Sequence, residues 1–508
     1  MKKLISTLLG LFLLFSACND TTKTADSLMR STPEKEGVSS QGILKFIEAV
    51  EQSGQEWHSF VFVRHGKVIA EGWWNPYQAG LKQTVYSLSK TFTSTAIGFA
   101  VSENLLSVED KVISFFPDLL PDTVSPYLAK MSVQNLLTMT VGQEPEPARI
   151  TRGTEWTKQF LAAPVVYEPG TKFLYNSMAT YMLSAIIQKV TGQRTLDYLQ
   201  SRLFEPLSIN GVDWEITPEG INTGGWGLRI QTEGMAKLGL LYLQKGKWNG
   251  QQILPVSWIE EATTAKIIQK PEITPEQRGK DDWAQGYCYQ IWRCRNNAFR
   301  GDGAYGQYII VMPDQDAVIA IQANLNDMQK EIDIVWDYLL PAIRDKALPE
   351  NKTEEAALKQ KLASLTIEPL KGTSSNLQSL SEKEIKFTFA DNIPFGKLSV
   401  HLADNTCVLT IEDYPLVFGK EQWIAGETRR PVPNLIANSA SFSEFPSFKT
   451  YGSYCWKDEQ TLSLSLKYIE SPHTELFELN FDGDSLRTRY SNGVNYSFRR
   501  EMVGVKVE

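Results

Sequence analysis

The chain reads Val85-Tyr86-Ser87-Leu88-Ser89-Lys90-Thr91-Phe92-Thr93 just ahead of an apolar, alanine-bearing run at residues 96–100. At the start of a helix, Ser87 and Lys90 would lie on the same face, one turn apart. The pKa of a lysine falls readily on burial, and the neutral amine can then take a serine proton. The helix N-terminus adds backbone N–H groups beside the serine oxygen. These are the parts of an acyl-transfer nucleophile that needs no histidine.

A plainer interpretation treats Ser87 as a helix cap and Lys90 as a solvated side chain. An isolated Ser-x-x-Lys pattern favours that interpretation, because the pattern is short and common. This one is the single Ser-x-x-Lys in the chain. A catalytic role therefore depends on partner motifs further along.

Length and composition describe an ordinary globular protein of more than one domain. The chain has 508 residues, of which 42% are hydrophobic and 22% charged, and its net charge is −8. The acidic balance and the lack of a basic stripe argue against nucleic acid as a partner. Neither the cysteines nor the four histidines have metal-ligand spacing, so we expect no metal and no cofactor.

The N-terminus resembles a bacterial lipoprotein signal. Two lysines precede an apolar run at residues 4–17, which is shorter than the ~20 residues of a spanning helix. The small residues before Cys18 imply cleavage there and lipidation of that cysteine; ordinary cleavage with a free Cys18 is the alternative. We expect a signal peptide at 1–17, a polar tether at 18–32, and a protein exported to the bacterial cell envelope and lipid-anchored to a membrane.

The remaining sequence predicts two domains. Residues 33–343 carry a hairpin at His65-Gly66, helices, and late strands at 308–312 and 317–322, which predicts an α/β domain with an antiparallel sheet. Residues 344–380 are charged or Ser-rich and predict a linker. From residue 381 to 508 apolar residues alternate, as in Ile385, Phe387 and Phe389, with a turn signal at Asp482-Gly483, which predicts an all-β barrel or sandwich.

Four cysteines follow Cys18. Cys288 and Cys294 fall in one strand-like run, residues 287–294, which would span ~20 Å and keep them out of disulfide reach. A disulfide between Cys407 and Cys455 is left open.

Two further motifs accompany Ser87-x-x-Lys90 in the order and rough spacing of a known family. Phe173-Leu174-Tyr175-Asn176-Ser177 precedes a helix and resembles the Tyr-x-Asn element of class C β-lactamases. The stretch at residues 300–307 leads into a strand, where those proteins carry Lys-Thr-Gly or His-x-Gly. Residues 32–343 thus resemble the serine β-lactamase-related hydrolases, which include penicillin-binding proteins, esterases and amidohydrolases. The C-terminal β domain is extra.

The resemblance implies a role for each matching residue. Ser87 would be the nucleophile, and Lys90 and Tyr175 would share the general acid and base work, each through a lowered pKa. The backbone N–H groups of Ser87 and Ala304 would form the oxyanion hole. Substrate-binding positions would be Ser177, Gly301, Asp302 and Gly303.

Three departures weaken the match to a β-lactamase. Ser177 stands where the family usually has Asn, and Gly301 and Asp302 replace the Lys and Thr of Lys-Thr-Gly. A carboxylate there would repel a substrate carboxylate, unless Asp302 points away or pairs with Arg300. We therefore expect a serine hydrolase that is a poor β-lactamase and acts on an ester or amide without that carboxylate, or on one bearing an amine. The competing class is a non-catalytic or weakly active penicillin-binding-like protein that binds a cell-envelope ligand.

Overall fold

The computed structural model describes residues 27–147, 153–373, 383–390, 394–430, 447–494 and 499–507. The predicted signal peptide and Cys18 lie outside these ranges. Among the residues described, no helix has the length and apolar character needed to cross a membrane.

A six-stranded antiparallel sheet joins the early and late strands of the first domain, as predicted. Its order is β2-β1-β11-β10-β9-β8. The predicted hairpin is present, with His65 in the left-handed region (φ 48°) at the turn. The strands are β1 Glu56–Arg64, β2 Lys67–Trp73, β8 Trp292–Arg293, β9 Phe299–Gly303, β10 Gln307–Met312 and β11 Ala317–Asn324.

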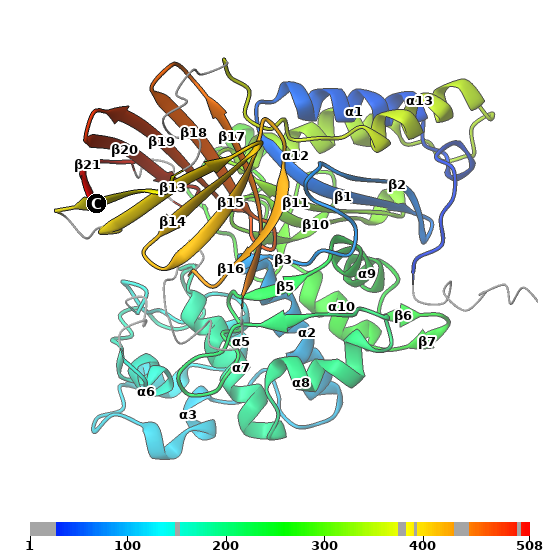
Figure 1. Ribbon diagram of the computed structural model, residues 1–508. Helices are drawn as coiled ribbons and strands as arrows, with labels where there is room; N and C mark the ends of the chain where they lie inside the picture. Colours follow the sequence, from blue (N-terminus) through cyan, green and yellow to red (C-terminus); the bar gives the residue numbers. More distant parts are fainter. Residues whose placement is uncertain are drawn as a thin grey trace, which may run out of the picture.

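Helices cover both faces of this sheet (Figure 1). One face packs on α1 (Ser40–Gln52), which Ser39 caps, and on α12 (Met328–Ile334) and the π-helical turn η6 (Val335–Leu339). The other face packs on α9 (Thr232–Leu243) and α2 (Ser89–Ser102), and α7 (Ser177–Thr191) packs on α2. Alternate residues of β1 serve the two cores, with Phe60 and Phe62 on the α1 side and Val61 and Val63 on the α2 side.

Shorter elements complete the first domain. A small sheet has the order β3-β5-β4, and β6 pairs with β7. The bounds are β3 Gln83–Thr84, β4 Asp213–Trp214, β5 Leu228–Ile230, β6 Lys247–Trp248, β7 Gln251–Gln252, α3 Val112–Phe115, α4 Pro126–Lys130, α5 Val133–Leu137, α6 Trp156–Ala162, α8 Thr195–Leu199, α10 Val256–Thr263 and α11 Pro275–Arg278.

The predicted strand at residues 287–294 is wrong. Tyr287 bridges back to Trp292, and Gln290 adopts φ 59°, so the chain makes a tight turn and only Trp292–Arg293 joins the sheet. The Gln290 side chain stabilises this turn by donating to the carbonyls of Leu136 (2.9 Å) and Leu137 (3.1 Å). Cys288 and Cys294 are both free and buried.

The C-terminal domain is a closed nine-stranded barrel, which decides between the two predicted architectures. The strands pair in the order β15-β14-β13-β12-β21-β20-β19-β18-β17, and a parallel pairing of β15 with β17 closes the ring. Cys407 and Cys455 are free within it. The strands are β12 Ile385–Phe389, β13 Lys397–Ala403, β14 Thr406–Ile411, β15 Tyr414–Lys420, β16 Ile424–Thr428 (paired outside the ring), β17 Phe448–Trp456, β18 Thr461–Tyr468, β19 Thr474–Asp482, β20 Ser485–Asn492 and β21 Arg499–Val507.

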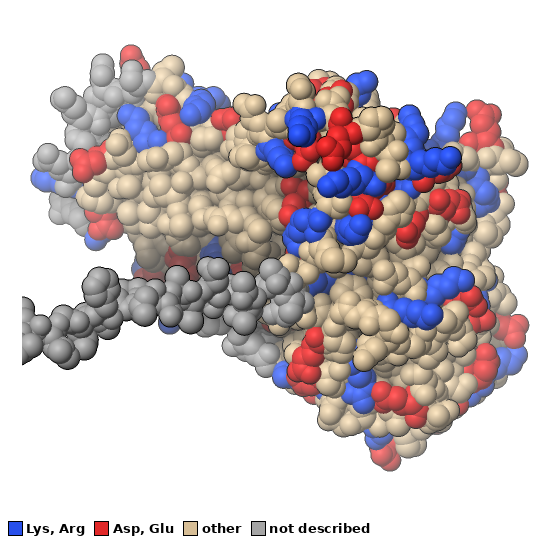
Figure 2. All heavy atoms as spheres, turned by 90° about the vertical axis from the view of Figure 1, so that its right-hand side faces the viewer, with Lys and Arg blue, Asp and Glu red and all other residues tan. Residues whose placement is uncertain are grey.

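The segment between the domains is packed onto the first domain. Helix α13 (Lys352–Ala363) lies against α1, and Leu358 and Leu365 are buried in the core on that face. Figure 2 shows the side of the molecule that faces right in Figure 1, where acidic and basic side chains are interspersed.

Candidate active site

The nucleophile candidate lies in a short 3-10 turn, η2 (Tyr86–Leu88), that runs directly into α2. Tyr86 adopts the left-handed region (φ 47°), which non-glycine residues seldom enter and which is typical of strained functional turns. The turn is stabilised by Ser89, whose hydroxyl donates to the carbonyl of Tyr86 (2.6 Å). Ser87 itself caps no helix and remains partly exposed. The geometry thus disfavours the capping interpretation.

Lys90 is buried in the centre of the site, with 2% of its surface exposed. Its Nζ donates to Ser87 Oγ (3.1 Å), Ser177 Oγ (3.2 Å) and the carbonyl of Gly225 (2.6 Å). Burial lowers the pKa of Lys90 from 10.5 to about 7, although nearby carboxylates oppose the shift. Near neutral pH this amine can therefore exchange a proton with Ser87.

Tyr175 lies beside the same amine. The Lys90 Nζ is 5.0 Å from the centre of the Tyr175 ring, which stacks on Trp292 at 6.0 Å. Burial raises the pKa of Tyr175 well above 10, and a hydrogen bond with Ser87 opposes this rise. The predicted lowering of the Tyr175 pKa is therefore wrong, because desolvation of the phenolate, reinforced by the charges of Asp302 and Glu146, outweighs the Ser87 hydrogen bond. Tyr175 is a neutral phenol that can donate a proton.

Strand β9 packs directly on the nucleophile turn. A Cβ on Gly303 would lie 2.1 Å from the carbonyl oxygen of Val85, and one on Gly301 would lie 2.3 Å from Leu88 Cδ1. Gly303 therefore requires glycine, whereas a side chain on Gly301 would have to displace the Leu88 and Thr91 side chains. The close approach brings Ala304, which follows β9, to the edge of the turn that holds Ser87.

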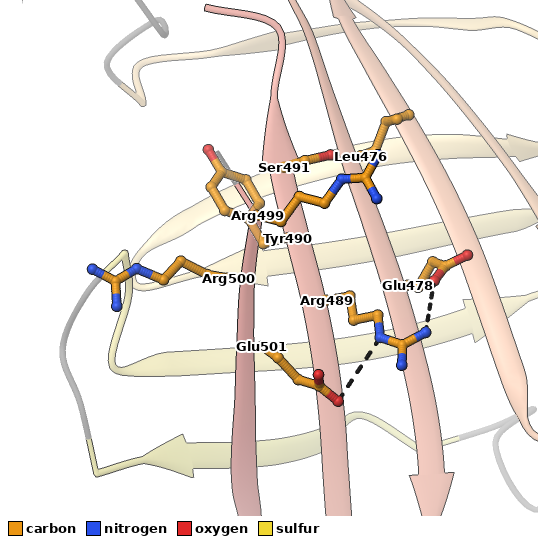
Figure 3. A pocket seen from close by; sticks show the side chains of 8 residues that line it. All are labelled: Leu476, Glu478, Arg489, Tyr490, Ser491, Arg499, Arg500 and Glu501. Carbon is orange, nitrogen blue, oxygen red and sulfur yellow. Dashed lines mark ion pairs between the residues drawn. The ribbon is translucent and has the colours of Figure 1, made fainter. Parts of the chain in front are cut away.

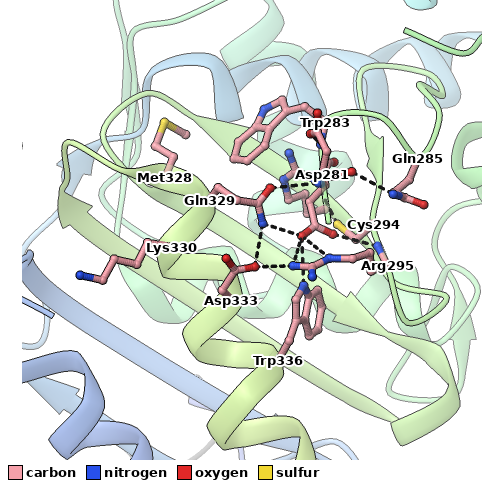
Figure 4. Close-up of polar contacts among 12 residues, drawn as sticks. Asp281, Trp283, Gln285, Cys294, Arg295, Met328, Gln329, Lys330, Asp333 and Trp336 are labelled. Carbon is pink, nitrogen blue, oxygen red and sulfur yellow. Dashed lines mark hydrogen bonds and ion pairs between the residues drawn. The ribbon is translucent and has the colours of Figure 1, made fainter. Parts of the chain in front are cut away.

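Asp302 pairs with Arg300, one of the two alternatives that the sequence left open. Arg300 Nε and Nη2 lie 2.9 and 2.8 Å from the same Asp302 oxygen, with side-chain exposures of 0% and 9% for the arginine and the aspartate. Burial raises the pKa of Asp302, and the guanidinium opposes this. The arginine is fixed in turn by the carbonyl of Asp282 (2.7 Å), beside the polar network of Figure 4.

Two site features were missed in the sequence. Glu146 accepts the backbone N–H of Ser177 (2.6 Å), and the Gly225 carbonyl accepts from Lys90. A Cβ on Gly225 would lie 2.7 Å from the Ser177 carbonyl, so the glycine cluster at 224–227 signals close backbone approach. No local pattern marks Glu146, because only the fold brings its loop to α7.

The structure therefore brings Ser87, Lys90, Tyr175 and Ser177 together and places the β9 end beside them. Among the described residues, no group of three or more His, Cys, Asp or Glu side chains could hold a metal ion. A separate hollow of about 510 Å³ lies on the outer wall of the barrel, where Arg489 is 3.8 Å from both Glu478 and Glu501 (Figure 3). It shares no residue with the site.

Comparison with known proteins decides the family. The family model described as Beta-lactamase matches residues 47–341, more than half of the chain. The chain belongs to the β-lactamase family. This confirms the resemblance drawn from the three motifs, and family members are serine hydrolases. The matched residues end before β12, so the barrel lies outside the family domain.

Within the family, the chain is 23% identical over 286 residues to the 6-aminohexanoate-dimer hydrolase of Paenarthrobacter ureafaciens, covering 51% of this chain and 71% of that protein. It is 24% identical over 153 residues to a β-lactamase of Escherichia coli K12, covering 29% of this chain and 40% of that protein.

Two solved structures share the fold. A Bacillus anthracis protein assigned as a 6-aminohexanoate-dimer hydrolase matches with a TM-score of 0.50 and 22% identity, covering 64% of this chain and 88% of its own. A Bacteroides dorei protein assigned as a β-lactamase matches with a TM-score of 0.51 and 16% identity, covering 60% of this chain and 99% of its own.

Proposed function

We propose that this member of the β-lactamase family is a serine hydrolase that works through an acyl-enzyme on Ser87. The observation that supports this most is the position of Lys90. Its buried amine, with a pKa of about 7, lies 3.1 Å from Ser87 Oγ. A structural lysine would be solvated or paired with a carboxylate, whereas this amine contacts two hydroxyls and a carbonyl.

In acylation, neutral Lys90 takes the Ser87 proton while Oγ attacks the substrate carbonyl carbon. The negative charge on the substrate oxygen is stabilised by the backbone N–H groups of Ser87 and Ala304. The bond to the leaving group then breaks, and that group takes a proton from the Tyr175 hydroxyl. The Lys90 ammonium returns the proton to Tyr175, which stays neutral between steps.

In deacylation, water gives a proton to neutral Lys90 and attacks the acyl carbon. The ester bond to Ser87 breaks, and Oγ recovers its proton from the ammonium. Lys90 thus carries the proton in both halves of the cycle. The products are a carboxylic acid and the free enzyme.

The substrate is an ester or amide that requires no free cation on β9. Gly301 supplies no side chain, and Arg300 is fully buried against Asp302. A β-lactam carboxylate would therefore find neither a cation nor a hydroxyl on this strand, and we propose a poor β-lactamase. Because Arg300 already neutralises Asp302, this carboxylate offers little attraction to a substrate amine. The relative named as a 6-aminohexanoate-dimer hydrolase makes a non-β-lactam amide a reasonable first substrate class.

The test is a comparison of turnover. Purified protein is assayed with p-nitrophenyl esters, p-nitroanilides and a chromogenic cephalosporin, beside Ser87→Ala. We expect ester or anilide hydrolysis at least 100-fold above the cephalosporin in kcat/KM, lost in the variant. A cephalosporin rate comparable to the best ester overturns the substrate proposal. No Ser87-dependent turnover of any substrate favours the binding-protein class.

We also propose that the protein is exported and anchored by a lipid on Cys18. The support is the order of lysines, apolar run, small residues and cysteine in the sequence. Growth with an alkyne-tagged fatty acid should label the expressed protein, and Cys18→Ala should abolish the label. Equal labelling of the variant would contradict the proposal.

A further inference from the structure

The C-terminal barrel contacts both backbone segments that supply the oxyanion hole. On one side, the turn between β18 and β19 meets the nucleophile segment: the N–H of Thr84 donates to the carbonyl of Glu470 (2.9 Å), and the Tyr86 hydroxyl hydrogen-bonds with His473 Nε2. On the other side, the Tyr305 hydroxyl donates to the carbonyl of Val494 (2.5 Å), just past β20. Figure 1 shows the barrel strands reaching β3, which leads into this turn.

The two tyrosines are the chain neighbours of the two oxyanion donors. Tyr86 precedes Ser87, and Tyr305 follows Ala304. Both adopt the left-handed region, with φ of 47° and 66°. Such a conformation persists in a bulky residue only where surrounding contacts hold it. Their side chains are held by the barrel, so the barrel has the means to fix the peptide planes on which the two N–H groups lie.

His473 contacts both tyrosine rings. Its ring is 5.0 Å from that of Tyr305 in an edge-on contact and 5.7 Å from that of Tyr86, and the two tyrosine rings are 5.4 Å apart. His473 is fully buried, and burial lowers its pKa to about 3, so it stays neutral. Its own backbone is fixed, because its N–H donates to Ser471 Oγ (3.1 Å) and its carbonyl accepts from Tyr468 (3.0 Å).

We propose that His473 is a positioning residue for the oxyanion hole, and that the barrel is thereby an integral part of the catalytic apparatus. His473 touches no reacting atom. It acts through Tyr86 and Tyr305, by holding the two backbone turns that aim the N–H groups of Ser87 and Ala304 at one point. This inference rests on the proposed Ser87 acyl-enzyme, and it gives the barrel a function that the family domain does not include.

The test measures acylation of the full-length protein by a fluorophosphonate and turnover of its best ester. The variants are Tyr86→Phe and His473→Phe, which remove the shared hydrogen bond but keep the rings, and the double variant. His473→Gln offers a hydrogen-bonding group near the Nε2 position. Trp423→Phe is the matched control, because it removes another hydrogen bond of the barrel, from Trp423 Nε1 to the carbonyl of Ile367 (2.7 Å), that involves neither Tyr86 nor Tyr305.

We expect each Phe variant to lower the acylation rate constant and kcat by about 10- to 100-fold, in the range of losing an oxyanion donor or less. KM should change by less than about threefold, the double variant should be no worse than either single one, and His473→Gln should recover most of the rate. Trp423→Phe should acylate like wild type, even if its melting temperature falls as far as that of His473→Phe.

Three results would count against the inference, and each has a different meaning. If the wild type acylates at Ser87 and His473→Phe acylates at the same rate, the barrel does not position the oxyanion hole, while the proposed function stands. If the wild type takes up no label, the proposed function fails and this inference fails with it. A rate loss in Trp423→Phe equal to that in His473→Phe would also count against it, since any weakening of the barrel would then suffice.

Discussion

At the scale of single residues, the site depends on one amine that is held away from water. Lys90 is buried and contacts Ser87, Ser177 and the Gly225 carbonyl, none of which carries a charge. The sequence supported this much, because a single Ser-x-x-Lys preceded an apolar run. The sequence did not predict that Tyr175 stays protonated, because its pKa depends on how deeply the fold buries the phenol. Spacing predicts proximity, whereas a pKa depends on the completed environment.

The lowered pKa of Lys90 predicts the pH dependence of the reaction. The base must be neutral to accept the Ser87 proton, so kcat/KM should rise as pH increases through about 7 and level off above it. Below the transition the rate should fall roughly tenfold per pH unit. This is measured as a pH profile of kcat/KM with an uncharged ester. Binding of an inert analogue at each pH shows that the protein has not unfolded in acid. A flat profile from pH 5 to 8 would exclude Lys90 as the base.

Replacement of Lys90 by methionine should separate activity from stability. Burial disfavours the charged amine, so between pH 7 and 10.5 the unfolded chain binds a proton that the folded chain does not, which destabilises the fold. We expect Lys90→Met to lose at least about 1,000-fold in kcat/KM while its melting temperature is unchanged or higher. Thermal unfolding at pH 7 checks this, and a drop of more than 5 °C or so would contradict it.

At the scale of elements, sequence patterns succeeded where local chemistry decides the structure. The hairpin at His65-Gly66 and the late strands β10 and β11 were all predicted. The structure of residues 287–294 was not predicted correctly. Their residues alternate as in a strand, but Gln290 turns the chain through contacts with α5 residues that are far away in sequence. Patterns cannot reveal a turn whose partners are tertiary.

The contact between β9 and the nucleophile turn yields a prediction for Gly303. A Cβ there would lie 2.1 Å from the Val85 carbonyl oxygen, a backbone atom that cannot yield without moving the Ser87 turn. Gly303→Ala should therefore reduce acylation by at least about 100-fold. The control is Gly279→Ala, whose Cβ would meet its nearest atom at 3.4 Å. Wild-type activity in Gly303→Ala would show that β9 does not abut the nucleophile as described.

At the scale of the whole molecule, the two domains are joined by buried charges as well as by the tyrosines. Lys467 of the barrel, 2% exposed at its side chain, pairs with Glu56 of β1 at 2.7 Å. Arg229 pairs with Glu470 at 3.3 Å. The all-β nature of the second domain was readable from its period-two pattern, but its closure and its docking were not, since both depend on strands and side chains that meet only after folding.

The Lys467–Glu56 pair predicts a pH-dependent contribution to stability. Burial alone would raise the pKa of Glu56, but Lys467 and His58 lower it from 4.5 to about 2. The stabilisation is therefore fully present above pH 4.5 and lost as pH falls toward 2. Lys467→Met should lower the free energy of unfolding by roughly 1–3 kcal/mol at pH 7, less than for a fully buried pair because Glu56 is partly exposed.

Denaturant titrations of wild type and Lys467→Met at several pH values measure this difference. It should narrow as the pH falls from 4.5 toward 2. A difference that stays constant over that interval would mean that Lys467 stabilises by packing alone.

The most direct test of the account is the site of covalent modification. The protein is treated with a fluorophosphonate, its intact mass is recorded, and the modified residue is located by peptide sequencing. We predict one phosphonate per chain, on Ser87, formed more slowly below pH 7 and absent in Ser87→Ala. Modification at another serine, or equal labelling of Ser87→Ala, would contradict the central claim that Ser87, activated by Lys90, is the nucleophile.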